Sequence, residues 1–389
     1  MLELINKEEC CGCWACVNVC PKKCISMEFD NEGFAYPKID MNLCIDCGLC
    51  EKVCPTYNNP EKDEFITEGF ACKNRDDSSR ISSSSGGMFI LLCEEVIKNN
   101  GVVFGAALNK DMVVKHCFAE TLEDCEKFKG SKYVQSQIEN TYSEAKKFLN
   151  EGRLVLFSGT QCQIKGLNLY LRKQYDNLIS VDIICHGVPS PKVLEMHKDN
   201  LKREYKSEIT NLKFRDKRIG WHKFSFVAEF ENNSVYTKRA GEDPYLKGFL
   251  ENLYLRPSCY ECKSKNFTGG SDISLADYWG VEKLHPEFTD EKGISLVLVN
   301  SKKGLNIFNK ISNKIYCIKT SMDNAINHNK CIIKPTFKTD NREKFFNMVE
   351  KKGLDSSVKT ILRPKFNVRV KNKIYWTFKK IKRKMGDKS

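Results

Sequence analysis

A repeated cysteine spacing near the N-terminus and an alternation of strand-like and helical segments behind it predict two parts with different folds. We expect an α+β ferredoxin-like N-terminal module followed by an α/β body with a mixed sheet. The spacing occurs twice within residues 1–60. Apolar runs of strand length alternate with helical segments from residue 65 onward, which favours parallel strands. Residues 209–239 are typical of an antiparallel hairpin region, which makes the predicted sheet mixed.

Length and composition describe an ordinary water-soluble protein. The chain has 389 residues, 41% hydrophobic and 29% charged, which is enough for a sizeable core. Residues 1–10 lack the apolar stretch of a signal peptide, and the longest apolar runs are too short to cross a bilayer. We therefore expect a cytoplasmic protein. In the cytoplasm thiols stay reduced, so the 20 cysteines favour metal binding over disulfides.

Eight cysteines in the N-terminal module follow the spacing C-x-x-C-x-x-C-x-x-x-C-P in two copies. The first copy consists of Cys10, Cys13, Cys16 and Cys20, and the second of Cys44, Cys47, Cys50 and Cys54. This is the spacing of bacterial two-cluster 4Fe-4S ferredoxins, in which the fourth cysteine ligates the other cluster. We expect Cys54 to complete the cluster of the first copy and Cys20 that of the second. Zinc is the alternative metal, although its sites rarely use three cysteines within seven residues. Cys11 and Cys24 fall outside the pattern.

The helices and strands of the body are predicted from apolar periodicity and from the residues that begin and end them. A linker is expected at residues 56–64, because that stretch is polar, contains proline and lacks periodicity. The predicted strands are 65–74, 102–108, 153–159 and 178–185, and the predicted helices are 88–101, 131–152, 160–173 and 190–205. The predicted division is a ferredoxin domain at 1–60, an N-terminal part of the body at 65–150, a C-terminal part at 151–335 and an extension at 336–389.

The loop at residues 82–87, which contains four serines and two glycines, leads into the predicted helix at residue 88. Hydroxyls, free backbone N–H groups and the positive end of a helix dipole suit a phosphate or pyrophosphate. The alternative is a flexible, well-capped helix start without a ligand.

Four further cysteines of the body have positions that favour a metal centre. Cys162 and Cys185 each follow a predicted buried strand, where α/β proteins place their sites. Cys259 and Cys262 form a C-x-x-C pair. The four could ligate a third cluster or a zinc ion, or they could be buried core cysteines.

Five motifs in the same order resemble the coenzyme F-420 hydrogenase/dehydrogenase beta-subunit family over roughly residues 65–335. They are SSSSGGMF, GSKYVQS, LFSGTQCQIKGL, DIICHGVPSP and SCYECKSKN…SDISLADYWG. The form with an N-terminal ferredoxin module resembles those encoded among bacterial polysaccharide-biosynthesis genes. The chain departs from the family at Gln161, where a proline is usual, and at Ala276, where a glycine is common.

The resemblance implies an iron–sulfur flavoprotein oxidoreductase that passes electrons between 4Fe-4S clusters and FAD and acts on an organic substrate. A glycan-related substrate and an electron-carrier partner such as a ferredoxin are expected. By motif, the implied flavin-binding residues are Ser82, Ser83, Ser84, Ser85, Gly86, Gly87, Ser131, Lys132 and Tyr133. The implied ligands of a third 4Fe-4S cluster are Cys162, Cys185, Cys259 and Cys262. The alternative is an electron-transfer subunit that serves a partner enzyme and has no substrate of its own.

Two residues are candidates for catalysis. Lys132 could stabilise an anionic reduced flavin or contact a phosphate, and His186 could donate a proton because its ordinary pKa lies near neutral pH. The alternatives are a solvated surface lysine and a capping histidine beside Cys185.

The C-terminal tail is strongly basic. From Arg363 to the end there are eleven lysines and arginines and one acidic residue. Apolar residues interrupt the lysines, so the tail could lie on an anionic membrane, or it could be solvated and unstructured. The charge does not line a groove interleaved with aromatic residues, so no specific nucleic-acid partner is expected.

Overall fold

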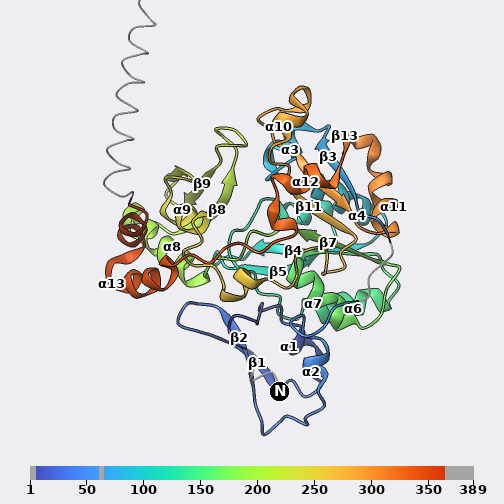
Figure 1. Cartoon of the computed structure of the whole chain (residues 1–389), viewed down its shortest axis with the longest axis horizontal. Helices are drawn as coiled ribbons and strands as arrows, with labels where there is room; N and C mark the ends of the chain where they lie inside the picture. The colour runs from blue at the N-terminus through green and yellow to red at the C-terminus, as the bar shows by residue number, and fades with distance from the viewer. Residues whose placement is uncertain (1–5, 61–64, 364–389) are drawn as a thin grey trace, which may run out of the picture.

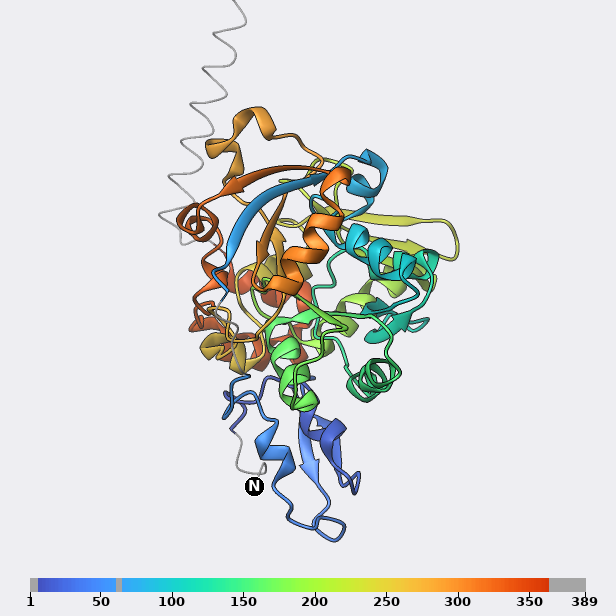
Figure 2. The ribbon, with the colours of Figure 1, turned by 90° about the vertical axis from the view of Figure 1, so that its right-hand side faces the viewer.

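The computed structural model describes residues 6–60 and 65–363. The N-terminal module lies below the body in the view of Figure 1 and projects from it again in the view of Figure 2. The predicted membrane contact of the basic tail falls on residues 364–389, outside the described residues. No helix in the described part of the chain combines the length and the apolar character that crossing a membrane requires.

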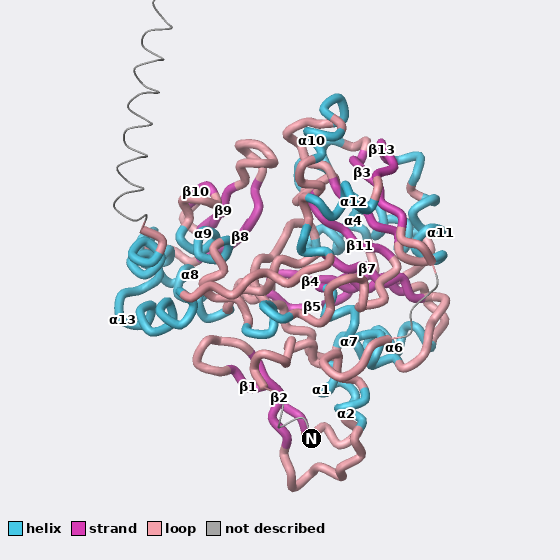
Figure 3. Tube along the Cα trace, in the orientation of Figure 1, coloured by secondary structure: helices cyan, strands magenta, loops and turns pink. Residues whose placement is uncertain are grey.

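The module consists of two short helices, one hairpin and connecting loops, and most of it is loop (Figure 3). Its elements are α1 (Ala15–Val19), β1 (Ile25–Phe29), β2 (Ala35–Ile39) and α2 (Leu49–Lys52). Strands β1 and β2 pair antiparallel and form the hairpin. The Asp30 carboxylate closes its turn by accepting hydrogen bonds from the backbone N–H groups of Glu32 and Phe34, both at 3.0 Å.

The body is built on one eight-stranded sheet with the order β13-β3-β12-β11-β7-β6-β4-β5. Its strands are β3 (Glu68–Asn74), β4 (Val102–Leu108), β5 (Val114–Ala119), β6 (Val155–Thr160), β7 (Leu178–Ile183), β11 (Ile273–Asp277), β12 (Ser295–Val299) and β13 (Ile315–Thr320). The four central strands β11, β7, β6 and β4 are parallel and the outer pairs are antiparallel, so the predicted mixed sheet is confirmed. Strands from residues 65–150 and 151–335 share this sheet: β3, β4 and β5 come from the first range and the other five strands from the second.

Helices cover both faces of the sheet. On one face, α4 (Met88–Lys98) and α11 (Lys302–Lys310) bury apolar side chains against it. On the other face lie α6 (Thr141–Asn150) and α7 (Gln161–Leu171). Short helices complete this part: α3 (Asp77–Ser82), α5 (Leu122–Cys125), α10 (Val281–Leu284) and α12 (Met322–Asn327).

The predicted antiparallel region lies in a second, smaller sheet and does not join the eight-stranded one, whose mixed character comes from its own outer strands. The strands of the smaller sheet are β8 (Ile209–Asp216), β9 (Ser225–Phe230) and β10 (Val235–Arg239), in the order β10-β9-β8. Around it pack α8 (Pro191–Tyr205), α9 (Pro244–Leu250) and α13 (Asn341–Ile361). The Ser190 side chain caps α8, because its hydroxyl accepts a hydrogen bond from the Val193 N–H.

The helix predicted at residues 131–152 is shorter than expected. Only α6, from Thr141, is helical, and residues 131–140 form loop and turn with one isolated bridge at Gln137. There Gln137 pairs with the edge strand β5: its carbonyl accepts from the His116 N–H at 2.8 Å, and its N–H donates to the Val114 carbonyl. Val134, Ile138 and Tyr142 are buried at helical spacing, which accounts for the prediction, but the pairing of Gln137 with the sheet edge competes with a helix before Thr141.

The module docks against the body at a site that requires a glycine. Gly166 lies on α7, and a Cβ atom there would come within 3.0 Å of both Cβ and Sγ of Cys13. Helix α7 also carries Cys162 one turn earlier. The glycine therefore allows a cysteine of the module to approach the helix that holds a cysteine of the body.

Replacing Gly166 with valine is expected to push the module away from α7 while leaving both sets of N-terminal cysteines intact. On the electron route that the sequence resemblance implies, we expect unchanged iron content of the module and a slower transfer of electrons from it to the body, measured by stopped-flow reduction. Gly241→Ala is the matched control, because nothing lies within 4 Å of the position of its Cβ. Equal rates for wild type and Gly166→Val would contradict the close approach.

Candidate redox site

The cysteine repeat folds the same way in both copies. In the first copy Gly12 and Trp14 have φ of 64° and 66°, and at the equivalent positions of the second copy Asp46 and Gly48 have φ of 50° and 66°. Alternating left-handed residues turn successive backbone N–H groups toward the inside of the loop, as in anion-binding nests. Both loops are therefore shaped to surround a group that carries negative charge on sulfur.

Cys20 lies with the cysteines of the other copy. It lines a small cavity of about 30 Å³ together with Cys44, Cys47 and Cys50. Of these, Cys47 is exposed to solvent. Cys24, outside the repeat, also lines this cavity, and its Sγ lies 3.3 Å from the Sγ of Cys20. This arrangement is the one that crossed ligation requires.

The remaining four cysteines of the repeat gather on the side of the module that faces the body. Cys10, Cys13 and Cys54 are buried. The pKa of the Cys16 thiol is raised well above its usual range by burial and by the nearby Cys10 and Cys54 thiols. The module thus has one group of cysteines toward solvent and one toward the body.

The four cysteines predicted in the body form a third group. All of them line a cavity of about 600 Å³: Cys162, Cys185, Cys259 and Cys262. The first two follow the neighbouring parallel strands β6 and β7, and the others lie in the short 3-10 helix Pro257–Glu261 and at the residue that follows it. Burial, together with the nearby Cys162 and Cys262 thiols, raises the pKa of Cys185 to about 12.

The charges around these thiols fit an anionic cluster. Three buried cations lie beside them, namely Lys165, Lys265 and Arg256. Within residues 6–60 and 65–363, none of the three pairs with a carboxylate. The Lys165 ammonium donates instead to the Pro55 carbonyl at 2.8 Å. A buried cation is costly without a nearby negative charge, and cluster thiolates would supply it.

Four thiolates can hold either a single zinc ion, which binds sulfur at about 2.3 Å, or a four-iron cube. Across the described residues, no group of three or more His, Cys, Asp or Glu side chains has the geometry of a site for one metal ion.

Cys11, which is not part of the repeated spacing, lies between two groups of cysteines. Its thiol is within hydrogen-bonding reach of both Cys13 of the module and Cys162 of the body. The carbonyl of Cys11 accepts a hydrogen bond from the Gln135 side chain at 3.0 Å. Nothing in the sequence indicates this role, because Cys162 is far away along the chain.

The two motifs implied to bind flavin meet at the wall of the large cavity. Of the nine residues implied to bind flavin, seven line this cavity: Ser83, Ser84, Ser85, Gly87, Ser131, Lys132 and Tyr133. The Ser84 hydroxyl oxygen accepts hydrogen bonds from the backbone N–H and the hydroxyl of Ser131, at 2.6 and 2.8 Å. Ser82 and Gly86 do not line the cavity. Gly86 packs against β3 and β12, where a Cβ would come within 2.4 Å of the Cys72 carbonyl oxygen.

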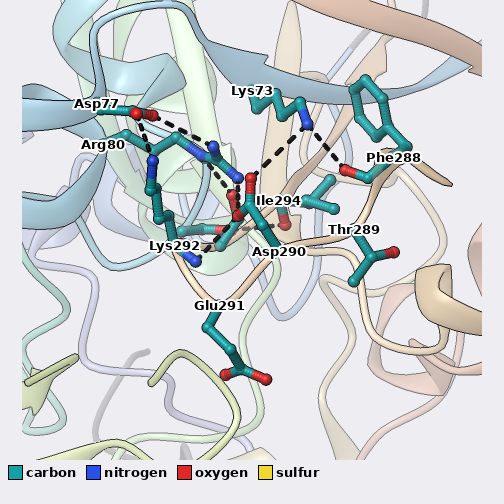
Figure 4. A network of polar contacts seen from close by, with 12 residues as sticks. Lys73, Asp77, Arg80, Phe288, Thr289, Asp290, Glu291, Lys292 and Ile294 are labelled. Carbon is teal, nitrogen blue, oxygen red and sulfur yellow. Dashed lines mark hydrogen bonds and ion pairs between the residues drawn. The ribbon is translucent and has the colours of Figure 1, made fainter. Parts of the chain in front are cut away.

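An ion-pair network holds the serine loop in place (Figure 4). The Arg80 guanidinium of α3 donates to the Gly293 carbonyl at 2.8 Å and pairs with Asp290. Lys292 pairs with Asp77 at the start of α3. The network fixes α3, and with it the entry to the serine loop, against residues 290–294.

Arg215 on β8 is a site residue that sequence reasoning missed. It is buried, and its guanidinium donates to the Ser84 carbonyl at 3.2 Å and the Tyr133 hydroxyl at 3.1 Å. It also pairs with Asp277 at 3.0 Å and lies against the rings of Phe224 and Trp279. Its Nη2 atom has no hydrogen-bond partner among the described residues. The buried guanidinium of Arg215 therefore contacts both of the motifs implied to bind flavin.

The two candidate catalytic residues both line the large cavity. The Lys132 ammonium donates to the carbonyls of Lys127 and Lys129, at 3.0 and 2.8 Å, and burial lowers its pKa to about 7. His186 Nε2 lies 2.6 Å from Asn252 Oδ1, and burial lowers the pKa of the imidazole. Lys132 can therefore exchange a proton near neutral pH.

The depressed pKa of Lys132 predicts a pH-dependent cost of burial. Between pH 7 and the ordinary lysine range near about 10.4, the unfolded chain binds more protons at this residue than the folded chain does. The contribution of Lys132 to the free energy of unfolding therefore rises as the pH increases from 7 to about 10.4. In denaturant unfolding, the stability of wild type relative to Lys132→Met should increase from pH 7 to pH 9. Lys129→Met, which removes an ammonium paired with Glu126, is the control. A difference that does not change with pH would contradict the prediction.

Two family descriptions match the chain. The C-terminal part of the beta subunit of coenzyme F420 hydrogenase/dehydrogenase matches residues 152–325, and the 4Fe-4S dicluster domain matches residues 9–58. The F component of the F(420)H(2) dehydrogenase of Methanosarcina mazei is 24% identical over 230 residues, which cover 54% of this chain and 65% of that protein. The chain thus spans slightly less than two thirds of that relative.

Two further comparisons concern the module and the fold. The 7Fe ferredoxin of Hydrogenibacillus schlegelii is 43% identical over 65 residues, which cover 16% of this chain and 76% of the ferredoxin. A chain in the structure of the F420-reducing [NiFe] hydrogenase complex from Methanosarcina barkeri aligns with a TM-score of 0.46 and 18% identity. That alignment covers 69% of this chain and 93% of the other.

Proposed function

We propose that the chain is an iron–sulfur flavoprotein oxidoreductase of the coenzyme F420 hydrogenase/dehydrogenase beta-subunit family, because residues 152–325 match the C-terminal part of that subunit and residues 9–58 match a 4Fe-4S dicluster domain. In this proposal electrons enter at the two clusters of the module and pass through a third cluster in the body to FAD. FAD supplies the conversion between one-electron transfer and the two-electron chemistry of an organic substrate.

One observation carries the proposal: a single cavity contains both the implied flavin motifs and the four body cysteines. Ser84 and Ser131 lie at its wall, and so do Cys162 and Cys259. The thiol of Cys11, which belongs to the module, interacts with the thiol of Cys162 in the body. An electron carrier in the module, a cluster and a flavin could therefore lie in series.

The proposed roles of the chain's own residues follow from their chemistry. Arg215 and Lys132 would face an anionic group of the cofactor, and the serine loop at the start of α4 would donate hydrogen bonds to it. Apolar side chains on the same wall, including Met88, Phe249 and Leu275, would exclude water from the flavin ring.

For the substrate and the partner we propose only a chemical class. The name of the Methanosarcina mazei relative makes reduced coenzyme F420 the first substrate to test. A glycan-related substrate stays a prediction from the sequence. The solvent-facing cysteine group, with Cys47 exposed, supports an exchange of electrons with a soluble carrier such as a ferredoxin.

Anaerobic purification followed by iron, sulfide and flavin analysis tests the proposal. Three complete cubes and one flavin require about twelve irons, about twelve sulfides and one FAD per chain. About eight irons without flavin, combined with stimulation of a partner enzyme, would instead support the electron-transfer subunit. Zinc in place of the third set of irons would contradict the electron route.

A further inference from the structure

Arg256 joins the body to the module from a fully buried position. It directly precedes the segment that carries Cys259, and none of its surface is exposed. Its Nε donates to the Cys10 carbonyl at 2.7 Å and its Nη2 to the Ala35 carbonyl at 3.0 Å. Its Nη1 donates to the Gln135 side-chain oxygen at 2.9 Å.

The same guanidinium lies beside sulfur. Nη2 is 3.6 Å from Cys10 Sγ, within reach of a hydrogen bond to a thiolate. On the other side, the positive charge also acts on Cys162 and Cys259 of the body. The Tyr36 ring lies against the guanidinium, with its centroid 4.3 Å away. No described carboxylate pairs with Arg256, so its charge is not neutralised locally by the protein.

The module makes room for this contact. Gly12, with φ of 64°, lies between Cys10 and Cys13, and a Cβ there would come within 2.7 Å of Arg256 Nη1. The solvent-facing group has a different environment. Residues such as Lys22 and Asp46 that line its cavity are exposed, and water screens their charges. One cysteine group of the module thus faces a buried cation and the other does not.

We propose that Arg256 is a positioning residue that raises the reduction potential of the body-facing cluster of the module. A reduced cluster carries one more negative charge than an oxidised one, and a nearby buried cation stabilises that extra charge. An electron that arrives at the solvent-facing cluster is then drawn toward the body. The effect on the module requires only its own two clusters, and the onward step to the body rests on the proposed function.

Redox titration of the full-length protein, followed by EPR, tests the proposal. In Arg256→Gln, the midpoint potential of one module cluster should become more negative by about 59 mV, which is a tenfold shift of a one-electron equilibrium. The other module cluster should keep its potential. Arg256→Lys retains the charge and should stay closer to wild type. Cys20→Ser, which perturbs the solvent-facing cluster, assigns the two signals.

Arg342→Gln is the matched control. Arg342 also docks the module, since it pairs with Glu32 and donates to the Leu255 carbonyl, but it does not contact the cysteines. Both module potentials should be unchanged in this variant. Unchanged potentials in Arg256→Gln with full iron content, or equal shifts in Arg256→Lys and Arg256→Gln, would overturn the proposal. If the wild-type protein contained neither a third cluster nor flavin, the proposed function would be refuted. The potentials of the two module clusters could still be measured and would still test the role of Arg256.

Discussion

Replacing Cys259 with serine is expected to remove about four irons and four sulfides from the anaerobically purified protein and to leave about eight of each. The two groups of cysteines in the module do not include Cys259, so their clusters should form normally. In the body, Cys162, Cys185 and Cys262 would remain as three ligands beside buried cations. Without a complete set of thiolates the third cluster should be lost, and reduction of the flavin through the module should fall to near zero.

Cys331→Ser is the matched control for this prediction. Cys331 lines the same cavity, and its Sγ lies 3.9 Å from Nδ1 of His186, but it does not belong to the group around Cys259. Its replacement should leave iron, sulfide and flavin reduction unchanged. Wild-type iron content in Cys259→Ser, or equal losses in the two variants, would show that the third group of cysteines does not hold a cluster.

The cysteine groups could be predicted because their geometry is set locally or by simple sheet rules. The repeat places each set of three cysteines in one loop, and its recurrence predicts that the fourth cysteines cross. Cys162 and Cys185 follow β6 and β7, which are neighbouring parallel strands whose carboxyl ends meet at one edge. Strand–helix alternation therefore predicted the parallel strands at the centre of the sheet and the position of these two thiols.

The residues that sequence reasoning missed are those placed by distant contacts. Arg215 lies 131 positions from Ser84, and Arg256 lies 246 positions from Cys10. Each is an ordinary arginine in its local sequence, and only the packing of the second sheet and of the module brings it to the site. The overlong predicted helix before Thr141 failed for a related reason, because pairing with an edge strand competes with the helix.

The structure also changes how the serine loop should be tested. Gly87 has φ of 77° directly before α4, and a Cβ there would lie 3.2 Å from Asn74 Cβ. Any side chain at this position would strain the backbone and disturb the start of the helix. A loss of flavin after substitution of Gly87 would therefore not identify the residue as part of a binding site. A side chain that reaches the loop from elsewhere gives a cleaner test.

Arg215→Met is expected to lower the affinity for FAD by about tenfold to a hundredfold while leaving the iron content unchanged. Hydrogen bonds to a charged group contribute about 1.5–3 kcal/mol, which corresponds to that range of affinity. Methionine keeps the apolar contacts with Phe224 and Trp279, but it removes the bonds to Ser84 and Tyr133 and the buried positive charge. Flavin titration of the reconstituted protein, with iron analysis and thermal unfolding in parallel, measures the effect.

The control for this variant lies three residues further along. Arg218 is exposed and pairs with Asp216 at 2.7 Å, and it does not line the cavity. Arg218→Met should bind FAD as wild type does, and Arg215→Lys, which keeps the charge but not the planar set of donors, should be intermediate. Wild-type affinity in Arg215→Met would place the anionic part of the cofactor away from the serine loop. Equal losses in the Arg215→Met and Arg218→Met proteins would mean that disturbance of β8, and not the contact with the loop, lowers the affinity.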